Sequence, residues 1–311
     1  MNRKLLYYIV CPRCKNRFTL YIRKIDKSRD EIETGILKCP CETYPIENFI
    51  PRLINYQQSE LNLKKIKLLW DMEWEYMKKS DIIYGLNQQM EIKNLLARLE
   101  INKEFLRDKT VLDAGCGIGR VTKNLSQYTG LAIGLEFSNI IGNYGKDLNA
   151  QFQLVQGDIL NPPFKDNIFD CIICKGTLHY VSSPSLCIKK MSFLLKRDAY
   201  LFFTVYKRKW NPIIKIIEFI RLFSTKLPIL LTFRLSFIAI PLFDIVSMAA
   251  RAKDTKLNLR EKPHIIFNIM SSKYLNRLSY REVYDLLKKN ALKCIRVGKK
   301  PITILAQKIS E

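Results

Sequence analysis

Short apolar runs alternate with helical stretches along the middle of the chain. The runs are Thr110–Ala114, Leu131–Leu135, Phe152–Val155, Phe169–Cys174 and Tyr200–Val205. Such runs are typical of strands in a parallel sheet that helices cover on both faces. A helix at Tyr280–Lys289 and two strands, Lys293–Val297 and Ile302–Gln307, complete the pattern. These residues therefore predict an α/β domain.

The first part of the chain has a different pattern. Residues 5–54 contain short strand candidates broken by cysteine turns and by prolines: Leu5–Val10, Phe18–Ile25 and Glu33–Leu37. From Ser59 to Phe105, apolar residues recur at spacings typical of helices. We therefore expect a small β-rich unit at 1–55, connecting helices at 56–108, and the α/β domain at 109–311.

An insertion interrupts the alternation after the fifth apolar run, at residues 207–263. Within it, Leu227–Ala250 is long enough to raise the question of a membrane span. Arg234 and Asp244 would each cost about 2.5–3.5 kcal/mol at the centre of a bilayer, and a single crossing would separate the last strands from the sheet. The mixture of apolar and basic residues instead predicts a helical cap or an interfacial surface.

Composition narrows the class of protein. Hydrophobic residues make up 48% of the 311 residues and charged residues 26%, which is globular composition and excludes disordered, collagen-like and coiled-coil proteins. Lysine and arginine total 52 against 29 acidic residues, a formal net charge of +23. This charge favours anionic partners such as RNA, acidic lipid headgroups or phosphorylated substrates, and does not choose among them.

Four of the nine cysteines lie close together in the first part of the chain, as Cys11-x2-Cys14 and Cys39-x-Cys41. Nine cysteines in 311 residues are too few for a disulfide scaffold, and residues 1–10 lack the apolar core of a signal peptide, so we expect a reducing, cytoplasmic setting. Two cysteine pairs in such a setting predict a structural zinc site, with unmetallated, packed thiols as the alternative. Four protein ligands leave no open position, so this metal is not expected to be catalytic.

A glycine-rich turn follows the first apolar run. It reads Asp113-Ala-Gly115-Cys-Gly117-Ile-Gly119 and leads into a helix. Glycines let the backbone approach a ligand closely, although a nicotinamide-binding turn has similar spacing. With its acidic residue before the first glycine, the segment resembles motif I of class I S-adenosylmethionine-dependent methyltransferases. The resemblance implies a Rossmann-like seven-stranded fold, in which Asp113 receives the amino group of the cofactor and Gly115 and Gly117 lie against its methionine part.

The same resemblance implies two more acidic positions. Glu136, at the end of the second apolar run, is expected to accept hydrogen bonds from the ribose hydroxyls. Asp158, followed by Ile159, comes after the third run and is expected at the adenine. Strand tips converge on the crevice where such sheets bind ligands, so three carboxylates in register favour a cofactor site over solvated turns.

Further motifs narrow the group within this fold. Asp158-x4-Pro163-Phe164-x-Asp166 and Gly176-Thr-Leu-His179 are similar to the segment that defines the small-molecule methyltransferases containing the quinone-pathway enzymes. Asn161-Pro-Pro-Phe164 invites comparison with the N-P-P-Y signature of amino methyltransferases. That signature follows the fourth strand, whereas this tetrapeptide precedes it, so we interpret it as a loop. The cysteine-rich segment also resembles the zinc-ribbon activator of tRNA and protein methyltransferases.

Several remaining side chains are candidates for a role in the site. His179 follows the fourth strand, where it could act as a general base or contact the substrate. His264 has no recognisable partner in the sequence and is expected at the surface. Cys171 and Cys174 are expected in the core. Trp70, Trp74 and Tyr76, at helical spacing, are expected to pack in the core, with closure over the cofactor as the alternative.

Three functions follow as hypotheses. The leading one is an S-adenosylmethionine-dependent methyltransferase acting on a small, lipophilic metabolite, with peripheral contact to an anionic membrane. The second is an RNA base methyltransferase, which the net charge of +23 favours. The third is a non-catalytic scaffold that binds S-adenosylmethionine, because intact carboxylates predict cofactor binding but not turnover.

Overall fold

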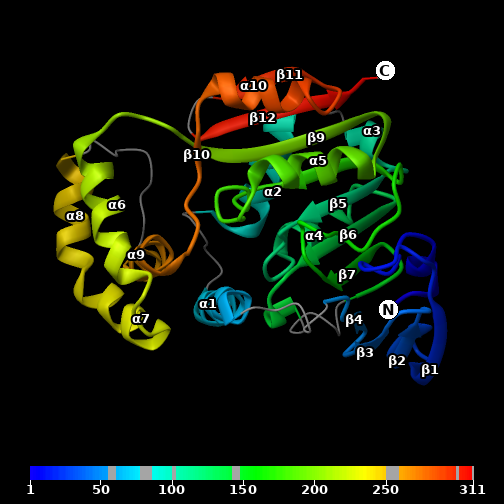
Figure 1. Cartoon of the computed structure of the whole chain (residues 1–311). Coiled ribbons are helices and arrows are strands. Elements are labelled where there is room, and N and C mark those ends of the chain that lie inside the picture. The colour runs from blue at the N-terminus through cyan, green and yellow to red at the C-terminus, as the bar shows by residue number, and fades with distance from the viewer. Residues whose placement is uncertain are drawn as a thin grey trace.

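The computed structural model describes residues 1–54, 61–77, 86–99, 103–141, 148–249, 259–298 and 301–309. Figure 1 shows three parts: a small sheet at the N-terminal end, a larger central sheet with helices on it, and a group of helices on the opposite side. Parts of the connecting region predicted at 56–108, and residues 250–258 of the predicted insertion, lie outside the described residues.

The central sheet has the order β11-β12-β9-β8-β5-β6-β7. Its strands are β5 (Thr110–Ala114), β6 (Leu131–Glu136), β7 (Phe152–Gln156), β8 (Phe169–Cys174), β9 (Leu195–Lys207), β11 (Leu292–Gly298) and β12 (Ile302–Lys308). Strands β5 to β9 pair in parallel and β12 is antiparallel to β9 and β11. A short strand, β10 (Arg277–Leu278), adds to the end of β9. This arrangement confirms the predicted Rossmann-like seven-stranded fold.

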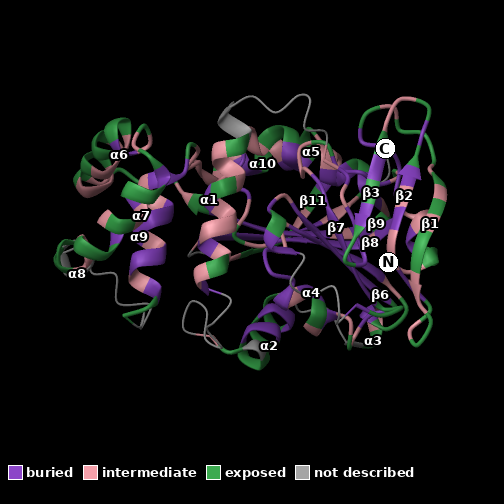
Figure 2. Cartoon of the chain, turned by 90° about the horizontal axis from the view of Figure 1, so that it is seen from below, coloured by how far each residue is buried: buried purple, intermediate pink, exposed green. Residues whose placement is uncertain are grey.

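The order of the strands in the central sheet indicates where a ligand would bind. The chain runs from β5 outward to β6 and β7, then returns to the other side of β5 to form β8. The carboxyl ends of β5 and β8 therefore flank the point where the strand order reverses, and ligands bind at such points. Strands β5, β6 and β7 are buried along their whole length, and most of their residues are apolar, as expected for strands covered on both faces (Figure 2).

Several helices accompany the sheet. They are α1 (Leu61–Met77), α2 (Gln88–Leu99), α3 (Lys103–Leu106), α4 (Arg120–Leu125), α5 (Pro184–Leu194) and α10 (Tyr280–Lys288). The side chain of Ser183 accepts from the N–H of Leu186 at the start of α5, and Ser279 and Glu282 form a capping box at the start of α10. These caps fix the two helices that pack beside β9 and β11.

The N-terminal cysteine unit, residues 1–54, is an antiparallel sheet of β1 (Thr19–Asp26), β2 (Glu31–Lys38), β3 (Thr43–Glu47) and β4 (Ile50–Pro51). The prediction of a strand at Leu5–Val10 was wrong. Residues Arg3–Tyr7 form a 3-10 helix instead, because the side chain of Asn2 accepts from the N–H of Lys4 and caps a helical turn.

The N-terminal cysteine unit is joined to the central sheet by backbone hydrogen bonds and by packing of side chains. The N–H of Leu53 donates to the carbonyl of Gln156 at the end of β7 (2.8 Å), and the N–H of Val10 donates to the carbonyl of Pro163 (3.0 Å). Ile9 pairs with Phe164, and the buried side chains of the unit belong to the same hydrophobic cluster as those of the central sheet. The unit therefore has no separate core of its own.

The helical cap comprises α6 (Pro212–Ser224), α7 (Ile229–Ile238), α8 (Ile240–Ala249) and α9 (Glu261–Ser271). Helix α9 contacts α6, α7, α8 and α1, and so forms the centre of the group (Figure 1). It extends past the predicted boundary at residue 263. The apolar stretch from Leu227 is divided between α7 and α8, and among the described residues no helix is long and apolar enough to cross a membrane.

Candidate functional site

The glycine turn after β5 has a backbone that other residues cannot adopt without strain. Gly115, Gly117 and Gly119 have φ angles of +82°, +56° and +78°. A Cβ atom on Gly115 would lie 2.2 Å from Oγ1 of Thr177, and one on Gly117 would lie 2.5 Å from the ring of Trp74. Two side chains from distant segments therefore lie directly against the glycine turn.

Asp113 is the next-to-last residue of β5, which is buried throughout. Its carboxylate is 4% exposed and accepts a hydrogen bond of 2.7 Å from Oγ1 of Thr122, in α4. Burial raises the pKa of Asp113 to about 7, while the bond from Thr122 and the charge of Lys175 act in the opposite direction. Such a carboxylate can hold a cationic group that reaches the tip of β5.

Glu136 lies at the tip of the neighbouring strand, β6. Its Oε2 accepts from the N–H of Gly117 (2.8 Å) and its Oε1 accepts from the N–H of Ser138 (2.9 Å). Burial raises the pKa of Glu136, and these backbone bonds oppose that rise. A carboxylate oxygen has two lone pairs, so both oxygens keep capacity for a pair of ligand hydroxyls.

Asp158 and Ile159 follow β7, the next strand. Oδ1 of Asp158 accepts from the N–H of Leu160 (2.8 Å), and burial raises the pKa of this carboxyl group. Both residues are half-buried. The parallel register aligns the ends of β5, β6 and β7, so the structure brings the three predicted carboxylates to one edge of the sheet.

His179 lies behind the end of β8 and is 4% exposed. Its ring stacks on Tyr206 of β9, with centroids 3.9 Å apart, and meets the ring of Tyr180 edge-on at 4.3 Å. Burial, with a smaller contribution from the charge of Arg277, lowers the pKa of His179 to about 3. The imidazole is therefore neutral at physiological pH and a weak proton acceptor.

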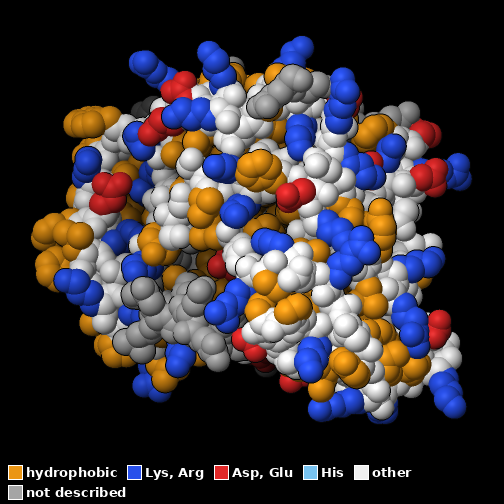
Figure 3. Space-filling view, turned by 45° about the vertical axis from the view of Figure 1, so that its right-hand side comes forward, with side chains coloured by type: hydrophobic (Ala, Val, Ile, Leu, Met, Phe, Trp, Pro, Cys, Tyr) orange, Lys and Arg blue, Asp and Glu red, His pale blue; other side chains and the backbone are white. Residues whose placement is uncertain are grey.

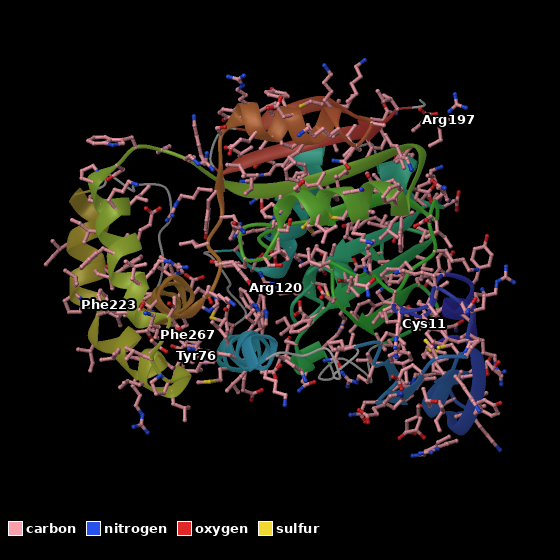
Figure 4. The ribbon with its side chains drawn as sticks, viewed as in Figure 1. Cys11, Tyr76, Arg120, Arg197, Phe223 and Phe267 are labelled. Atoms are coloured by element: carbon pink, nitrogen blue, oxygen red, sulfur yellow. The ribbon has the colours of Figure 1, made fainter. Side chains whose placement is uncertain are left out.

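Sequence reasoning missed a buried ion-pair network beside the glycine turn. Arg120, the first residue of α4, donates from Nε to Oε2 of Glu91 in α2 (2.8 Å), and Lys175, after β8, pairs with the other oxygen of Glu91. The network ties α2, α4 and the end of β8 together (Arg120 is labelled in Figure 4). Arg120 follows the last glycine of the motif directly, but its partner lies 29 residues earlier, so no local pattern reveals the pair.

The expectation for His264 was wrong. Its side chain is buried, and Nε2 lies 3.2 Å from Oε1 of Glu73 in α1, because α9 is packed on all sides by the other cap helices and by α1. Trp74, the next residue in α1, is the side chain that contacts Gly117. The aromatic residues of this helix were expected either to pack in the core or to close over the cofactor. The contact between Trp74 and Gly117 agrees with the second alternative, a helix that closes over the glycine turn.

The four N-terminal cysteines form one cluster, with Cys11 labelled in Figure 4. Their sulfur atoms all lie within 4.8 Å of one another, and Sγ of Cys41 is 3.6 Å from the Sγ atoms of both Cys11 and Cys39. Tetrahedral zinc with Zn–S bonds of about 2.3 Å requires sulfur atoms about 3.8 Å apart. Cys11, Cys14, Cys39 and Cys41 therefore fit zinc, despite the shortened second pair. Cys171 and Cys174, by contrast, are buried in β8 as predicted.

Comparison with known proteins adds to this geometry. Residues 112–203 match the family described as methyltransferase domain, and Asp113, Glu136, Asp158 and His179 all lie inside that segment. Over these residues the chain is similar to methyltransferase domains. The match covers the glycine turn and strands β6 to β8 in full.

Curated relatives match the methyltransferase domain over part of their length. Ubiquinone biosynthesis O-methyltransferase of Coxiella burnetii is 30% identical over 112 residues, which is 34% of this chain and 47% of that protein. Demethylmenaquinone methyltransferase of Staphylococcus carnosus is 28% identical over 136 residues, 42% of this chain and 55% of that protein. The chain thus spans about half the length of these relatives.

Solved methyltransferases are also similar to this chain. Magnesium protoporphyrin IX methyltransferase of Synechocystis, with bound SAH, has 12% sequence identity and a TM-score of 0.48, over 78% of this chain and 97% of that one. A possible histamine N-methyltransferase of Thermotoga maritima has 14% identity and a TM-score of 0.47, over 79% of this chain and all of that one.

Proposed function

We propose that the protein transfers a methyl group from S-adenosylmethionine to a small-molecule acceptor. The observation that carries this proposal is the row of acidic tips on β5, β6 and β7 around a glycine turn, inside the segment that matches the methyltransferase family. Asp113 would receive the amino group, Glu136 the ribose hydroxyls and Asp158 the adenine, with the backbone of Gly115 and Gly117 against the methionine part.

The cofactor supplies a methyl group that its sulfonium already activates, so the protein mainly has to align the reacting atoms. Thr177 and Trp74 touch the glycine turn from two sides and would limit the position of the bound methionine part. Ile159, beside Asp158, offers an apolar surface for the adenine. In this proposal His179 contacts the acceptor from the end of β8, since its low pKa makes it a weak base.

Calorimetry tests the cofactor assignment. Asp113→Ala and Glu136→Ala each remove a charge-assisted hydrogen bond worth about 1.5–3 kcal/mol, so we expect S-adenosylmethionine to bind about 10- to 150-fold more weakly. Asp166→Ala is the matched control, because this carboxylate is exposed in the loop after Asp158. Unchanged affinity in both site variants would contradict the proposal.

We further propose that residues 1–55 form a zinc-ribbon-like unit, that 56–108 connect it to the domain, and that 207–263 begin a cap over an apolar acceptor. The names of two relatives support a lipophilic acceptor, because they are enzymes of ubiquinone biosynthesis and demethylmenaquinone methylation. Helix α9, which continues the cap to Ser271, contacts α1, and its His264 lies 3.2 Å from Glu73, the residue before Trp74.

The outer surface of the cap supports contact with an anionic membrane. Large apolar side chains that are 40–87% exposed gather on α6, α7, α8 and the turn before them: Trp210, Ile216, Phe219, Ile220, Leu222, Phe223, Leu230, Leu231, Phe237, Ile238, Leu242 and Ile245 (Figure 3). Exposed Lys209, Lys215, Lys226 and Arg234 lie among them. Apolar patches of this extent mark interaction sites, and interspersed cations suit acidic headgroups.

Vesicle sedimentation tests this contact. We expect the protein to sediment with vesicles that contain phosphatidylglycerol and to remain largely unbound to phosphatidylcholine alone. Phe219→Ser combined with Phe223→Ser should release it, whereas Tyr21→Ser, on the exposed face of β1, should not. Equal binding by all three proteins, or binding to RNA in preference to vesicles, would contradict the membrane assignment.

A further inference from the structure

A cluster of buried polar side chains lies between α1 and the helical cap. Helix α1 buries Leu69, Glu73 and Met77 at intervals of four residues, so Glu73 places a carboxyl group in the middle of an apolar stripe. Helix α9 contributes His264 and Asn268, which are 1% and 2% exposed. With Nε2 of His264 3.2 Å from Oε1 of Glu73, the two helices bring an acid, an imidazole and an amide together.

Several atoms in and around this cluster are buried without a hydrogen-bond partner among the described residues. They are Oε2 of Glu73, Oδ1 of Asn268, the hydroxyls of Ser271 and Ser272 on α9 and its end, and Nδ1 of His179. Leaving such an atom unsatisfied costs about 1–3 kcal/mol, so buried polar atoms are nearly always paired with protein, water or a ligand. Their concentration in one region indicates a polar ligand site.

The cluster adjoins the glycine turn. Trp74 follows Glu73 in α1 and lies against Gly117, with its ring centroid 6.5 Å from that of His264. The charge of Glu136 contributes to raising the pKa of Glu73. Figure 4 shows the contact of the two helices, where Tyr76 of α1 and Phe267 of α9 are labelled.

The opposite side of the cluster is the end of β8. Trp70, one turn before Glu73 in α1, meets the ring of Tyr180 edge-on with centroids 5.0 Å apart. Tyr180 follows His179, and Asn276, after α9, donates to the carbonyl of His179 at 2.7 Å. The cluster is thus enclosed by the glycine turn, the end of β8 and α9, where an acceptor would meet the cofactor.

We propose that Glu73 receives the proton of a hydroxyl acceptor, with Asn268 as a second hydrogen-bond partner and His264 as the residue that positions Glu73. This inference rests on the methyl transfer proposed above. As the acceptor oxygen attacks the methyl carbon, the new C–O bond forms and the C–S bond breaks, with its electron pair going to sulfur. The O–H proton moves to Oε2 of Glu73, the oxygen that no described group occupies.

The chemistry of the cluster favours a hydroxyl over an amine. A neutral ether forms only when the hydroxyl loses its proton, whereas a neutral amine attacks first through its lone pair. Burial raises the pKa of Glu73 well above 4.5, reinforced by Glu136 and opposed by Asn268, which makes its carboxylate a stronger base than an ordinary one. Burial also lowers the pKa of His264 to about 4, so it is neutral beside Glu73.

The test uses the full chain, labelled S-adenosylmethionine and catechol as a hydroxyl probe. Glu73→Gln keeps the size of the side chain and one acceptor oxygen, but it cannot take a proton. We expect its kcat to fall by about 10²–10⁴-fold, the usual contribution of a general base, with cofactor affinity unchanged. Glu75→Gln, exposed on the same helix, is the matched control and should keep full activity.

The pH profile separates proton transfer from a purely structural role. His264 of α9 contacts Glu73, and Asn268 of α9, Tyr206 of β9 and Glu136 of β6 interact with it electrostatically or by hydrogen bonding. Wild-type kcat should rise with pH as Glu73 loses its proton, and Glu73→Gln should remove that rise. His264→Asn should shift the pH at which the rise occurs, because it changes the group that holds Oε1.

Two results would overturn the inference. One is full kcat in Glu73→Gln. The other is a wild-type protein that binds S-adenosylmethionine yet methylates aniline and not catechol, or methylates neither probe. A wild-type protein that fails to bind S-adenosylmethionine would instead refute the proposed function, and the role of Glu73 with it.

Discussion

The N-terminal cysteine unit and the helical cap are both additions to the same sheet, but they are attached in different ways. The cysteine unit shares its hydrophobic cluster with the central sheet and hydrogen-bonds to the end of β7. The cap has a small cluster of its own, formed by Leu69 of α1 with Ile229 and Phe267, and it leaves large apolar side chains exposed.

Because the two regions are attached differently, changes in them should affect different properties of the protein. Apolar surface that is buried against the sheet stabilises the domain, so changes in the cysteine unit should affect folding first. Apolar surface that stays exposed stabilises nothing in the isolated molecule, and it persists in proteins as interaction surface. Changes on the outer cap should therefore affect partners and leave folding nearly unchanged.

Loss of zinc should have the largest effect. Structural zinc contributes about 10–16 kcal/mol of apparent binding free energy in zinc-finger peptides at pH 7, and Cys39→Ser removes one of four ligands. We expect several kcal/mol to be lost from the free energy of unfolding, measured with denaturant. Hydrogen exchange should increase in β1 to β4 and at Leu53, which bonds to β7, and should stay unchanged in α9.

The control for this experiment is Cys294→Ser, a half-buried thiol of β11 far from the cluster in sequence. It should lower stability by less than Cys39→Ser does. Elemental analysis that finds no metal in the purified protein, together with four freely titratable thiols in the unit, would contradict the zinc assignment and weaken the contrast with the cap.

Phe164→Ala should have the next largest effect. Phe164 is 2% exposed, pairs with Ile9 of the cysteine unit and packs edge-on against Phe169 of β8, with centroids 5.2 Å apart. Truncation of a buried phenylalanine leaves a cavity and costs about 3–5 kcal/mol. A loss below 1 kcal/mol in denaturant unfolding would show that the cysteine unit and the sheet do not share a tightly packed core.

Affinity for the cofactor should depend on pH through the carboxyl group of Asp113. Its pKa of about 7 means that it is mostly ionised at pH 8 and mostly protonated at pH 6. Binding of a cationic amino group should therefore weaken about tenfold as the pH falls from 8 to 6. Folding stability should change in the opposite direction, because the folded state holds this proton more tightly than the unfolded chain.

Calorimetry at pH 6, 7 and 8 measures this response. Asp113→Asn should bind weakly at all three values, and replacing the cap should leave the response in place, since Lys175, Glu91 and Glu136 surround Asp113 from other elements. A slope that persists in Asp113→Asn would assign the titration to a neighbour such as Glu136.

Much of the fold could be predicted because it depends on local patterns. Short, mostly apolar runs identified β5 and β8 with the correct bounds, and the acidic residue before the glycine turn led to Asp113 through a family resemblance. The run Leu5–Val10 failed because an apolar pattern cannot distinguish a short strand from a 3-10 turn, and the side chain of Asn2 decided between them.

The cluster around Glu73 could not be predicted because it is made by contacts between distant segments. Glu73 and His264 come from helices about 190 positions apart, and no local rule pairs them. A signal was present in each helix: Glu73 is spaced four residues from Leu69 and from Met77, and His264 is four residues before Asn268. Polar residues at helical spacing inside an apolar stripe indicate a buried polar site.

Phe223→Ala should have the smallest effect on stability, and it completes the comparison because it makes the same truncation as Phe164→Ala. Phe223 of α6, labelled in Figure 4, is 60% exposed, and its ring meets that of Phe219 edge-on with centroids 5.5 Å apart. We expect the free energy of unfolding to stay within about 0.5 kcal/mol of wild type, as for most surface substitutions. Binding to phosphatidylglycerol vesicles should nevertheless weaken by about 1–2 kcal/mol, because the wild-type ring moves from water into the membrane surface when the protein binds. A large loss of stability with unchanged vesicle binding would contradict this expectation and show that the outer face of the cap stabilises the fold.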